Sequence, residues 1–136
     1  MISDIIKSNE RLIKYAIVGA SGVVINLGVL YTLTDYFGIH YMVSGLIAIE
    51  LSIINNFIWN DKWTFGGGTF KHGLFLRLLG YHCTSSVSTL IQMLILAGLT
   101  FRFGMYYIYA SCIGIFVAFV INYILNSKLT WEQKKE

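Results

Sequence analysis

Charged residues are scarce in this chain: they make up 12% of its 136 residues, whereas hydrophobic residues make up 56%. A soluble domain usually carries about twice that share of charge. The scarcity therefore excludes an ordinary soluble domain and indicates a membrane protein. The net charge of +3 comes without a dense basic cluster, so it predicts attraction to anionic lipids and no binding of nucleic acid.

The chain also lacks the patterns that mark common metal and catalytic sites. Its three histidines, His40, His72 and His82, are scattered without metal-ligand spacing and without a carboxylate pair beside them. The two cysteines, Cys83 and Cys112, fall in different apolar stretches, which indicates unpaired, buried thiols. We therefore expect a protein that is not an enzyme and that uses no metal or cofactor.

Four long apolar stretches are present, at about 13–33, 41–59, 78–99 and 105–125. Each is about 19 to 22 residues long, which is enough for a helix to cross the apolar core of a bilayer. The first stretch is too long, and too well matched by the other three, for a cleaved signal peptide, so we expect it in the mature protein. The sequence thus predicts an all-α membrane protein with four transmembrane helices.

The basic residues predict the orientation of these helices. Nine of the ten Lys and Arg residues flank the stretches on one side, and only Arg102 lies on the other. Because short cytoplasmic segments retain positive charge, both termini should be cytoplasmic.

The segment before the first stretch has an amphipathic pattern. Ile2, Ile5, Ile6, Leu12 and Ile13 lie mostly on one helical face, which favours an interfacial helix on the inner leaflet. A basic N-terminus that only enforces the topology is the alternative.

A repeat relates the two halves of the chain. Residues 11–65 align with residues 77–131 without a gap and are identical at 17 of 55 positions, more than shared apolar composition gives. The segments INNFIWNDKWTF and VINYILNSKLTW are among the most similar. Each half holds two apolar stretches, so we expect parallel repeats that enter the membrane in the same direction. Residues 1–136 then form a single transmembrane domain of two repeats.

Small and amide residues recur at every fourth position of the second stretch in each half, and so form one ridge on a helix surface. The ridge residues are Ser44, Ala48, Ser52, Asn56 and Asn60, matched by Ala110, Gly114, Ala118, Asn122 and Asn126. Small residues allow close helix packing, and asparagines can hydrogen-bond across the contact. We interpret the ridge as a packing surface between the second and fourth stretches. Contact of the asparagines with a polar ligand is a compatible alternative.

Basic residues lie near the asparagines at the ends of the stretches. Arg11 and Arg77 open the first stretch of each half, and Lys62 and Lys128 follow the second. Together with the ridge asparagines they would form a cationic mouth rich in amide donors, which suits an anionic lipid headgroup. Ordinary anchoring at the inner face explains the basic residues equally well.

Three polar side chains are expected inside the apolar core. Glu50 lies near the middle of the second stretch, where a carboxylate is costly and by default marks function; its counterpart in the repeat is Phe116. Asn26 corresponds to Gln92, and the two could line a polar path. Hydrogen bonds within the protein core are the alternative for all three.

Four segments resemble the GtrA-like family, which includes the GtcA proteins of teichoic acid glycosylation: RLIKYAIVG, NFIWNDKWTF, RLLGY and NYILNSKLTW. The resemblance covers about residues 11–131, although Ser127 and Leu129 replace the Asp61 and Trp63 of the first half. It implies four helices in the cytoplasmic (inner) membrane and flipping of a polyprenyl-phosphate-linked sugar, such as an undecaprenyl-phosphate monosaccharide, for envelope polysaccharide or teichoic acid glycosylation. It also implies membrane glycosyltransferases as partners.

On this resemblance we expect three groups of site residues. The residues expected to attract the phosphate are Arg11, Lys62, Arg77 and Lys128. Those expected to hold the headgroup hydroxyls or the ridge are Asn56, Asn60, Asn122 and Asn126. Those expected to line the polar path are Glu50, Asn26 and Gln92. Four helices leave little room for an enclosed path, so we expect a homo-oligomer or a groove open to lipid. A non-transporting scaffold for a polyprenyl-phosphate glycosyltransferase stays open. A small proton-coupled multidrug exporter fits less well, because dual-topology exporters need a weak charge bias.

Overall fold

The structure of the protein is a computed structural model that describes residues 2–134. Within that range the side chains of residues 2, 4, 41, 42, 45, 96, 107, 108 and 111 lie outside the description. The described residues form helices and no strand, apart from an isolated β-bridge between Phe70 and Gln133. The predicted all-α class is confirmed.

Four α-helices follow one another along the chain: α1 (Ile2–Tyr31), α2 (Tyr41–Trp59), α3 (Leu74–Ala97) and α4 (Tyr107–Leu125). Each continues into a π-helical turn of five residues: η1 (Thr32–Tyr36), η2 (Asn60–Thr64), η3 (Gly98–Arg102) and η4 (Asn126–Thr130). The amphipathic N-terminal segment is helical as predicted, but it is the first part of α1 and no break separates it from the apolar stretch.

Helices of this composition suit a bilayer, because an α-helix satisfies its backbone hydrogen-bonding groups internally. Among the described residues, three helical stretches are long and apolar enough to cross a membrane: Ile5–Tyr36, Leu74–Arg102 and Cys112–Thr130. These correspond to the first, third and fourth predicted spans. The second span coincides with the 19-residue helix α2, and its crossing of the membrane stays a prediction.

Large apolar side chains are exposed along all four helices, as expected of surfaces that face lipid. Leu46, Leu94 and Phe116, for example, are 64–71% exposed. Cys83 and Cys112 also belong to this exposed surface. They are unpaired as predicted, but the prediction that they are buried is wrong, because each lies on a face of its helix that no neighbouring helix covers.

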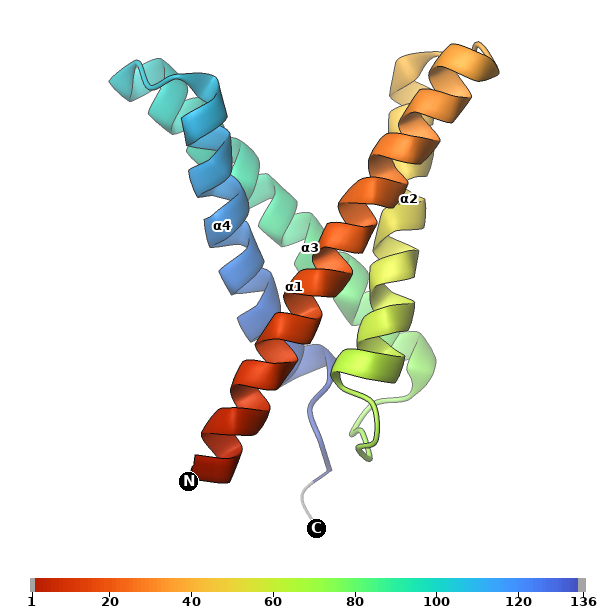
Figure 1. Cartoon of the computed structure of the whole chain (residues 1–136), viewed down its shortest axis with the longest axis vertical. Helices are drawn as coiled ribbons and strands as arrows, with labels where there is room; N and C mark the ends of the chain where they lie inside the picture. Colours follow the sequence, from red (N-terminus) through yellow and green to blue (C-terminus); the bar gives the residue numbers. More distant parts are fainter. Residues whose placement is uncertain (1, 135–136) are drawn as a thin grey trace. The chain divides into compact units, whose positions relative to one another are not determined.

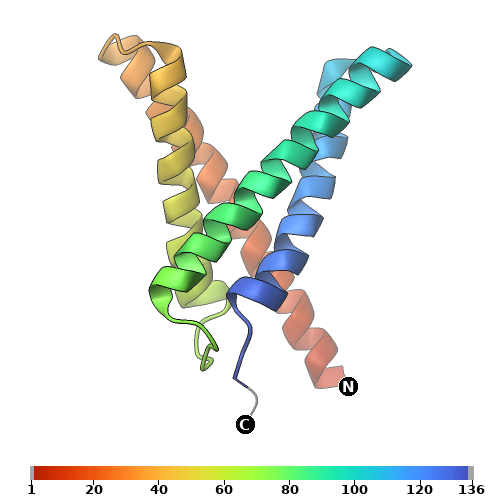
Figure 2. The same cartoon turned by 180° about the vertical axis from the view of Figure 1, so that it is seen from behind.

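The helices form two compact units, Met1–Gly68 and Thr69–Glu136. In the first unit α1 and α2 run side by side in opposite directions (Figure 1). In the second unit α3 and α4 do the same, as seen from behind in Figure 2. Each unit is therefore a helical hairpin.

Helix bounds correspond between the units with a constant shift of 66 residues, since α2 matches α4, η1 matches η3 and η2 matches η4 at both ends. The turns between the helices also match. Gly38 and Gly104 have φ of 68° and 63°, a conformation that side chains disfavour and glycine accepts without strain. The sequence repeat thus corresponds to a repeat of local structure.

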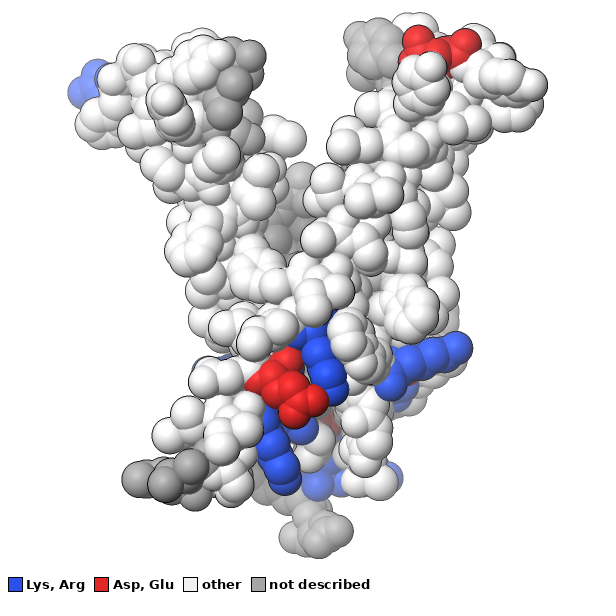
Figure 3. All heavy atoms as spheres, viewed as in Figure 1, with Lys and Arg blue, Asp and Glu red and all other residues white. Residues whose placement is uncertain are grey.

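Charged side chains gather at one end of each unit. Figure 3 shows Lys and Arg concentrated where the first helix of a hairpin begins and its second helix finishes, with few charged atoms along the middle. We call this the basic end of the unit. At the basic end of the second unit, the loop pairs with the C-terminal segment: Lys71 N–H donates to Glu132 O at 2.8 Å, and Lys134 N–H donates to Thr69 O at 2.9 Å.

The ridge of small and amide residues packs within each hairpin. Ser44, Ala48 and Ala110 are completely buried in their units. Gly114 packs on Gln92 of α3, whose carbonyl oxygen would lie 3.0 Å from an added Cβ. These close contacts are with the preceding helix of the same unit, since a short turn places consecutive helices side by side. A contact between the second and fourth stretches would join the two units, and it stays a prediction.

Candidate functional site

An asparagine–threonine pair closes the basic end of each unit. Thr64 Oγ1 donates to Asn60 Oδ1, and Thr130 Oγ1 donates to Asn126 Oδ1, both at 2.7 Å. All four residues are at most 4% exposed. The main-chain carbonyl of each asparagine accepts the N–H of the fifth residue after it, at 2.9 and 3.0 Å. Side chain and main chain together therefore fix the π-helical turn.

A buried aromatic pair lies beside each of these turns. Tyr15 and Phe65 meet edge to face with ring centroids 6.3 Å apart, and Tyr81 and Trp131 do so at 5.5 Å. Every one of these rings is at most 4% exposed. Such pairs add to the area buried between two helices. The repeated motif thus holds each hairpin together at its basic end, and for Asn60 and Asn126 packing is the observed role.

The second unit has a hydrogen-bond network around Asn126. Thr84 Oγ1 of α3 donates to Asn126 Oδ1 at 2.8 Å. The Asn126 amide nitrogen donates to both the main-chain and the side-chain oxygen of Asn122 at 2.9 Å. Sequence reasoning missed Thr84. The signal was its spacing with Ser85 and Ser88, small polar residues that share the buried face of α3.

The first unit has its polar contacts further along the helices. Ser52 Oγ of α2 donates to Gly22 O of α1 at 2.8 Å, and Asn55 Nδ2 donates to Ser21 Oγ at 3.1 Å. The Asn56 amide packs directly on Gly22, where an added Cβ would overlap it. Sequence reasoning missed Asn55, because only its neighbour Asn56 belongs to the repeated ridge.

The four basic residues predicted to bind phosphate lie at the basic ends. Arg11 on α1, Lys62 in η2 and Lys128 in η4 are exposed. Arg77 differs, since its guanidinium donates to a loop carbonyl at 2.8 Å and lies 4.5 Å from the centroid of the Phe70 ring. Arg77 therefore also orders the loop that precedes α3.

The predicted intramembrane residues lie away from the basic ends. Glu50 is exposed on α2, about 15 Å along the helix from Asn60 at 1.5 Å per residue. Asn26 on α1 and Gln92 on α3 are half-buried. Over residues 2–134, no three His, Cys, Asp or Glu side chains gather in a group that could hold a metal ion.

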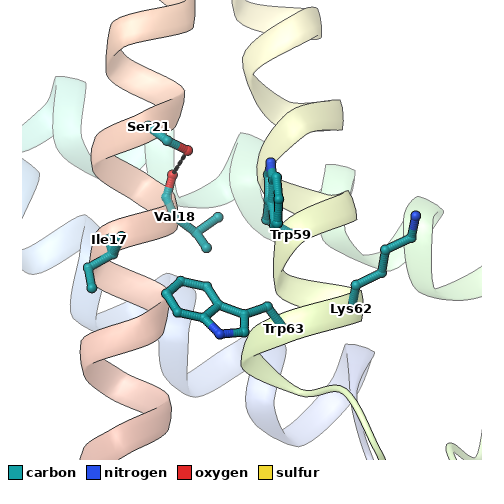
Figure 4. Close-up of a pocket in the computed structure, with 6 residues that line it drawn as sticks. All are labelled: Ile17, Val18, Ser21, Trp59, Lys62 and Trp63. Carbon is teal, nitrogen blue, oxygen red and sulfur yellow. Dashed lines mark hydrogen bonds between the residues drawn. The ribbon is translucent and has the colours of Figure 1, made fainter.

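The first unit also carries an open groove of about 580 Å³ between α1 and the end of α2, which sequence reasoning missed. Its lining residues, drawn in Figure 4, are Ile17, Val18, Ser21, Trp59, Lys62 and Trp63. Both indole rings face α1, whereas the Lys62 side chain extends away from it. Lys14 adds a second cation, with Nζ 5.6 Å from the centroid of the Trp63 ring and 2.6 Å from Glu10 Oε1.

Residues 14–131 match the GtrA/DPMS transmembrane domain family. The chain belongs to this family. The match covers all four helices of the structure apart from the first part of α1, and it confirms the resemblance to the GtrA-like family.

The chain is also similar to a dolichol-phosphate mannosyltransferase of Pyrococcus furiosus, to which it is 35% identical over 122 residues. The similarity covers 90% of this chain but 34% of the relative. The chain therefore spans about a third of the length of that protein.

Proposed function

We propose that this chain flips a polyprenyl-phosphate-linked sugar, such as an undecaprenyl-phosphate monosaccharide, across the membrane for glycosylation of a cell-envelope polysaccharide or teichoic acid. The observation that carries the proposal is the exposure of Arg11, Lys62 and Lys128 at the basic ends of apolar helices in a member of the GtrA/DPMS family. Exposed cations next to lipid-facing helices suit a substrate with a phosphate and a long apolar chain.

In this proposal the basic residues collect the phosphate. Arg11 and Lys62 would act in the first unit. In the second unit Lys128 would act together with Arg77, whose guanidinium also contacts the loop. The buried asparagines keep each basic end in shape, since a displaced hairpin end would move the lysine that follows it. Of the four ridge asparagines, Asn56 and Asn122 are half-buried and so have surface left for headgroup hydroxyls.

Glu50 is proposed to assist passage of the headgroup through the apolar region. Its carboxylate is exposed on α2, on a helix whose exposed neighbours include Leu46 and Ile47. A carboxylate there is expensive unless it meets a polar group. Asn26 and Gln92, half-buried at corresponding positions of α1 and α3, would extend the polar path.

The membrane topology belongs to the same proposal. The charge distribution favours both termini on the cytoplasmic side of the cytoplasmic membrane, with the two halves as parallel repeats. Because each unit is only a two-helix hairpin, we propose a homo-oligomer or a path open to lipid. Membrane glycosyltransferases that make and use the lipid-linked sugar would be the partners, and the chain itself would not be an enzyme.

A non-transporting scaffold is the second candidate. The observation in its favour is that the similar region makes up 34% of a mannosyltransferase, so a domain of this family occurs joined to an enzyme of that name. In a scaffold the basic ends would position a glycosyltransferase over its lipid substrate, and Glu50 would be dispensable.

The experiment is a translocation assay in proteoliposomes that contain only this protein and a fluorescent short-chain polyprenyl-phosphate sugar. We expect wild type to move the lipid and Glu50→Gln to slow it by at least about tenfold, a change of about 1.4 kcal/mol in the barrier. Glu132→Gln, which changes an exposed carboxylate in the C-terminal segment, is the control and should leave the rate unchanged.

Failure of wild type to move the lipid, in vesicles shown to contain folded protein, would sink the flippase proposal. Co-purification with a glycosyltransferase in that case would favour the scaffold. Equal rates for wild type and Glu50→Gln would remove Glu50 from the path.

A further inference from the structure

The groove of the first unit is built from residues that the repeat does not preserve. Trp59 and Trp63 of α2 and η2 correspond to Leu125 and Leu129 in the second half, whereas the neighbouring Lys62 is repeated as Lys128. The packing motif of the basic end is present in both halves, so the tryptophans are not needed to close a hairpin. They add aromatic walls to one half alone.

The walls of the groove are apolar in spite of Ser21. The Ser21 hydroxyl donates to Val18 O at 2.7 Å and accepts from Asn55 Nδ2, so both of its hydrogen-bonding roles are met within the protein. Trp59 and Trp63 are 52% and 41% exposed, and their rings face α1 across the opening (Figure 4). The groove therefore offers aromatic and aliphatic surface to an apolar ligand.

Cations lie at the rim of this apolar surface. Lys62 is one of the lining residues, although its ammonium extends away from α1 (Figure 4) and would have to turn on its flexible stem to reach a phosphate at the rim. Lys14 approaches the face of the Trp63 ring and is paired with Glu10. The basic end is where headgroups lie in the proposed topology, and tryptophan and lysine are both enriched at that depth. A single molecule that places an anion at the rim and a chain along the walls satisfies both parts of the site.

We propose that this groove binds the phosphate-proximal isoprenoid segment of a polyprenyl phosphate, with Lys62 and Lys14 at the phosphate. The proposal rests on the proposed function for the identity of the lipid. A volume of about 580 Å³ lies within the range of about 300–1,000 Å³ that is usual for small-ligand sites. Indole faces suit the flat, methyl-branched units of an isoprenoid, which present double bonds and methyl groups to the rings.

The test is equilibrium binding of geranylgeranyl phosphate to the full chain in phosphatidylcholine nanodiscs. The key variant is Trp59→Leu/Trp63→Leu, which installs the residues of the second half. We expect its affinity to fall by at least about tenfold. Lys62→Gln should lower the affinity for geranylgeranyl phosphate but not for geranylgeraniol, which lacks the phosphate.

Two further variants guard against a change in folding. Trp59→Phe/Trp63→Phe keeps aromatic walls and should stay within about threefold of wild type. Phe101→Leu removes a ring that is 89% exposed in η3, at the end of the second unit opposite its basic end, and should bind as wild type does. A benzophenone-bearing prenyl phosphate should in addition label residues 17–21 or 59–63.

The outcomes separate the groove from the flippase. Loss of binding in the leucine variant, with labelling at the groove, supports the groove whether or not wild type translocates lipid. Unchanged binding in that variant, or labelling elsewhere, overturns it even if translocation occurs. Equally tight binding of phosphatidylglycerol would also overturn it, because the groove would then be a site for ordinary membrane lipid.

Discussion

The two halves of the chain share the bounds of their second helices and of their π-helical turns, but they hold their helices together with different polar contacts. The first unit joins α1 to α2 through Ser52 and Gly22, away from the basic end, whereas the second joins α3 to η4 through Thr84 and Asn126 at the basic end itself. What both units keep is the asparagine–threonine pair and the aromatic pair. The aromatic pair joins the two helices, and the asparagine–threonine pair fixes the turn beside it. These shared contacts hold each hairpin together.

The features that differ most lie in the first half. Glu50 stands where the second half has Phe116, and the two groove tryptophans stand where it has leucines. None of these three side chains is buried, and none belongs to the contacts that both units share. The comparison therefore predicts that the first unit tolerates changes at these three positions.

The largest expected effect comes from breaking the close contact in the first unit. Gly22→Leu would drive a side chain into the Asn56 amide and separate α1 from α2. We expect a loss of at least about 3 kcal/mol in the free energy of unfolding, from overpacking and from the lost hydrogen bond of Ser52 to Gly22. Titration with SDS in mixed micelles measures it.

Gly28→Leu is the matched control on the same helix. An added Cβ at Gly28 has nothing within 4 Å, so this variant should unfold close to wild type. Equal unfolding midpoints for the two glycine variants would show that α1 and α2 are not held at Gly22.

The next largest loss of stability is expected from replacing the two repeated asparagines, Asn60 and Asn126. Asn126→Ala removes the acceptor of Thr84 and Thr130 and the donor to Asn122, whereas Asn60→Ala removes the acceptor of Thr64. We expect losses of about 2 kcal/mol for Asn126→Ala and about 1 kcal/mol for Asn60→Ala, because buried groups left unpaired add to the cost. The same SDS titration measures both, and a larger loss for Asn60→Ala would contradict this account of the second unit.

Sequence reasoning succeeded where the signal was periodic. Apolar length predicted the helices, and the repeated motif singled out Asn60 and Asn126. The matching bounds of α2 and α4 agree with the sequence repeat. Sequence reasoning did not identify partners. A pattern on one helix does not say which helix it meets, so the contacts of the ridge with the preceding helix were not predicted.

Cross-helix contacts explain the other failures. Thr84 and Asn55 act through residues more than 30 positions away, so local spacing can mark such a residue but does not identify its partner. The groove needs two tryptophans to face α1, which depends on how α2 is rotated about its axis. The roles of the charged residues in binding stay predictions, since their positions at the basic ends suit both anchoring and phosphate binding.

The smallest effects are expected at the position of Val18 and Thr84. Exchanging these two side chains tests whether they explain the different contacts at the two basic ends. Val18 in the first unit corresponds to Thr84 in the second, and both are buried against the following helix. Thr84→Val should cost about 0.6 to 1 kcal/mol, as for other hydrogen bonds between membrane helices. Val18→Thr normally costs stability because a hydroxyl is buried, but here Asn60 Oδ1 should accept it as Asn126 Oδ1 accepts Thr84.

A double-mutant cycle decides the point, because it isolates the coupling between two positions. Val18→Thr should be neutral or stabilising by about 0.6 kcal/mol in wild type, and destabilising in the Asn60→Ala background, where the acceptor is missing. If Val18→Thr destabilises both backgrounds equally, the Asn60 side chain lies out of reach of α1. The two basic ends would then differ in helix packing as well as in the residue at this one position.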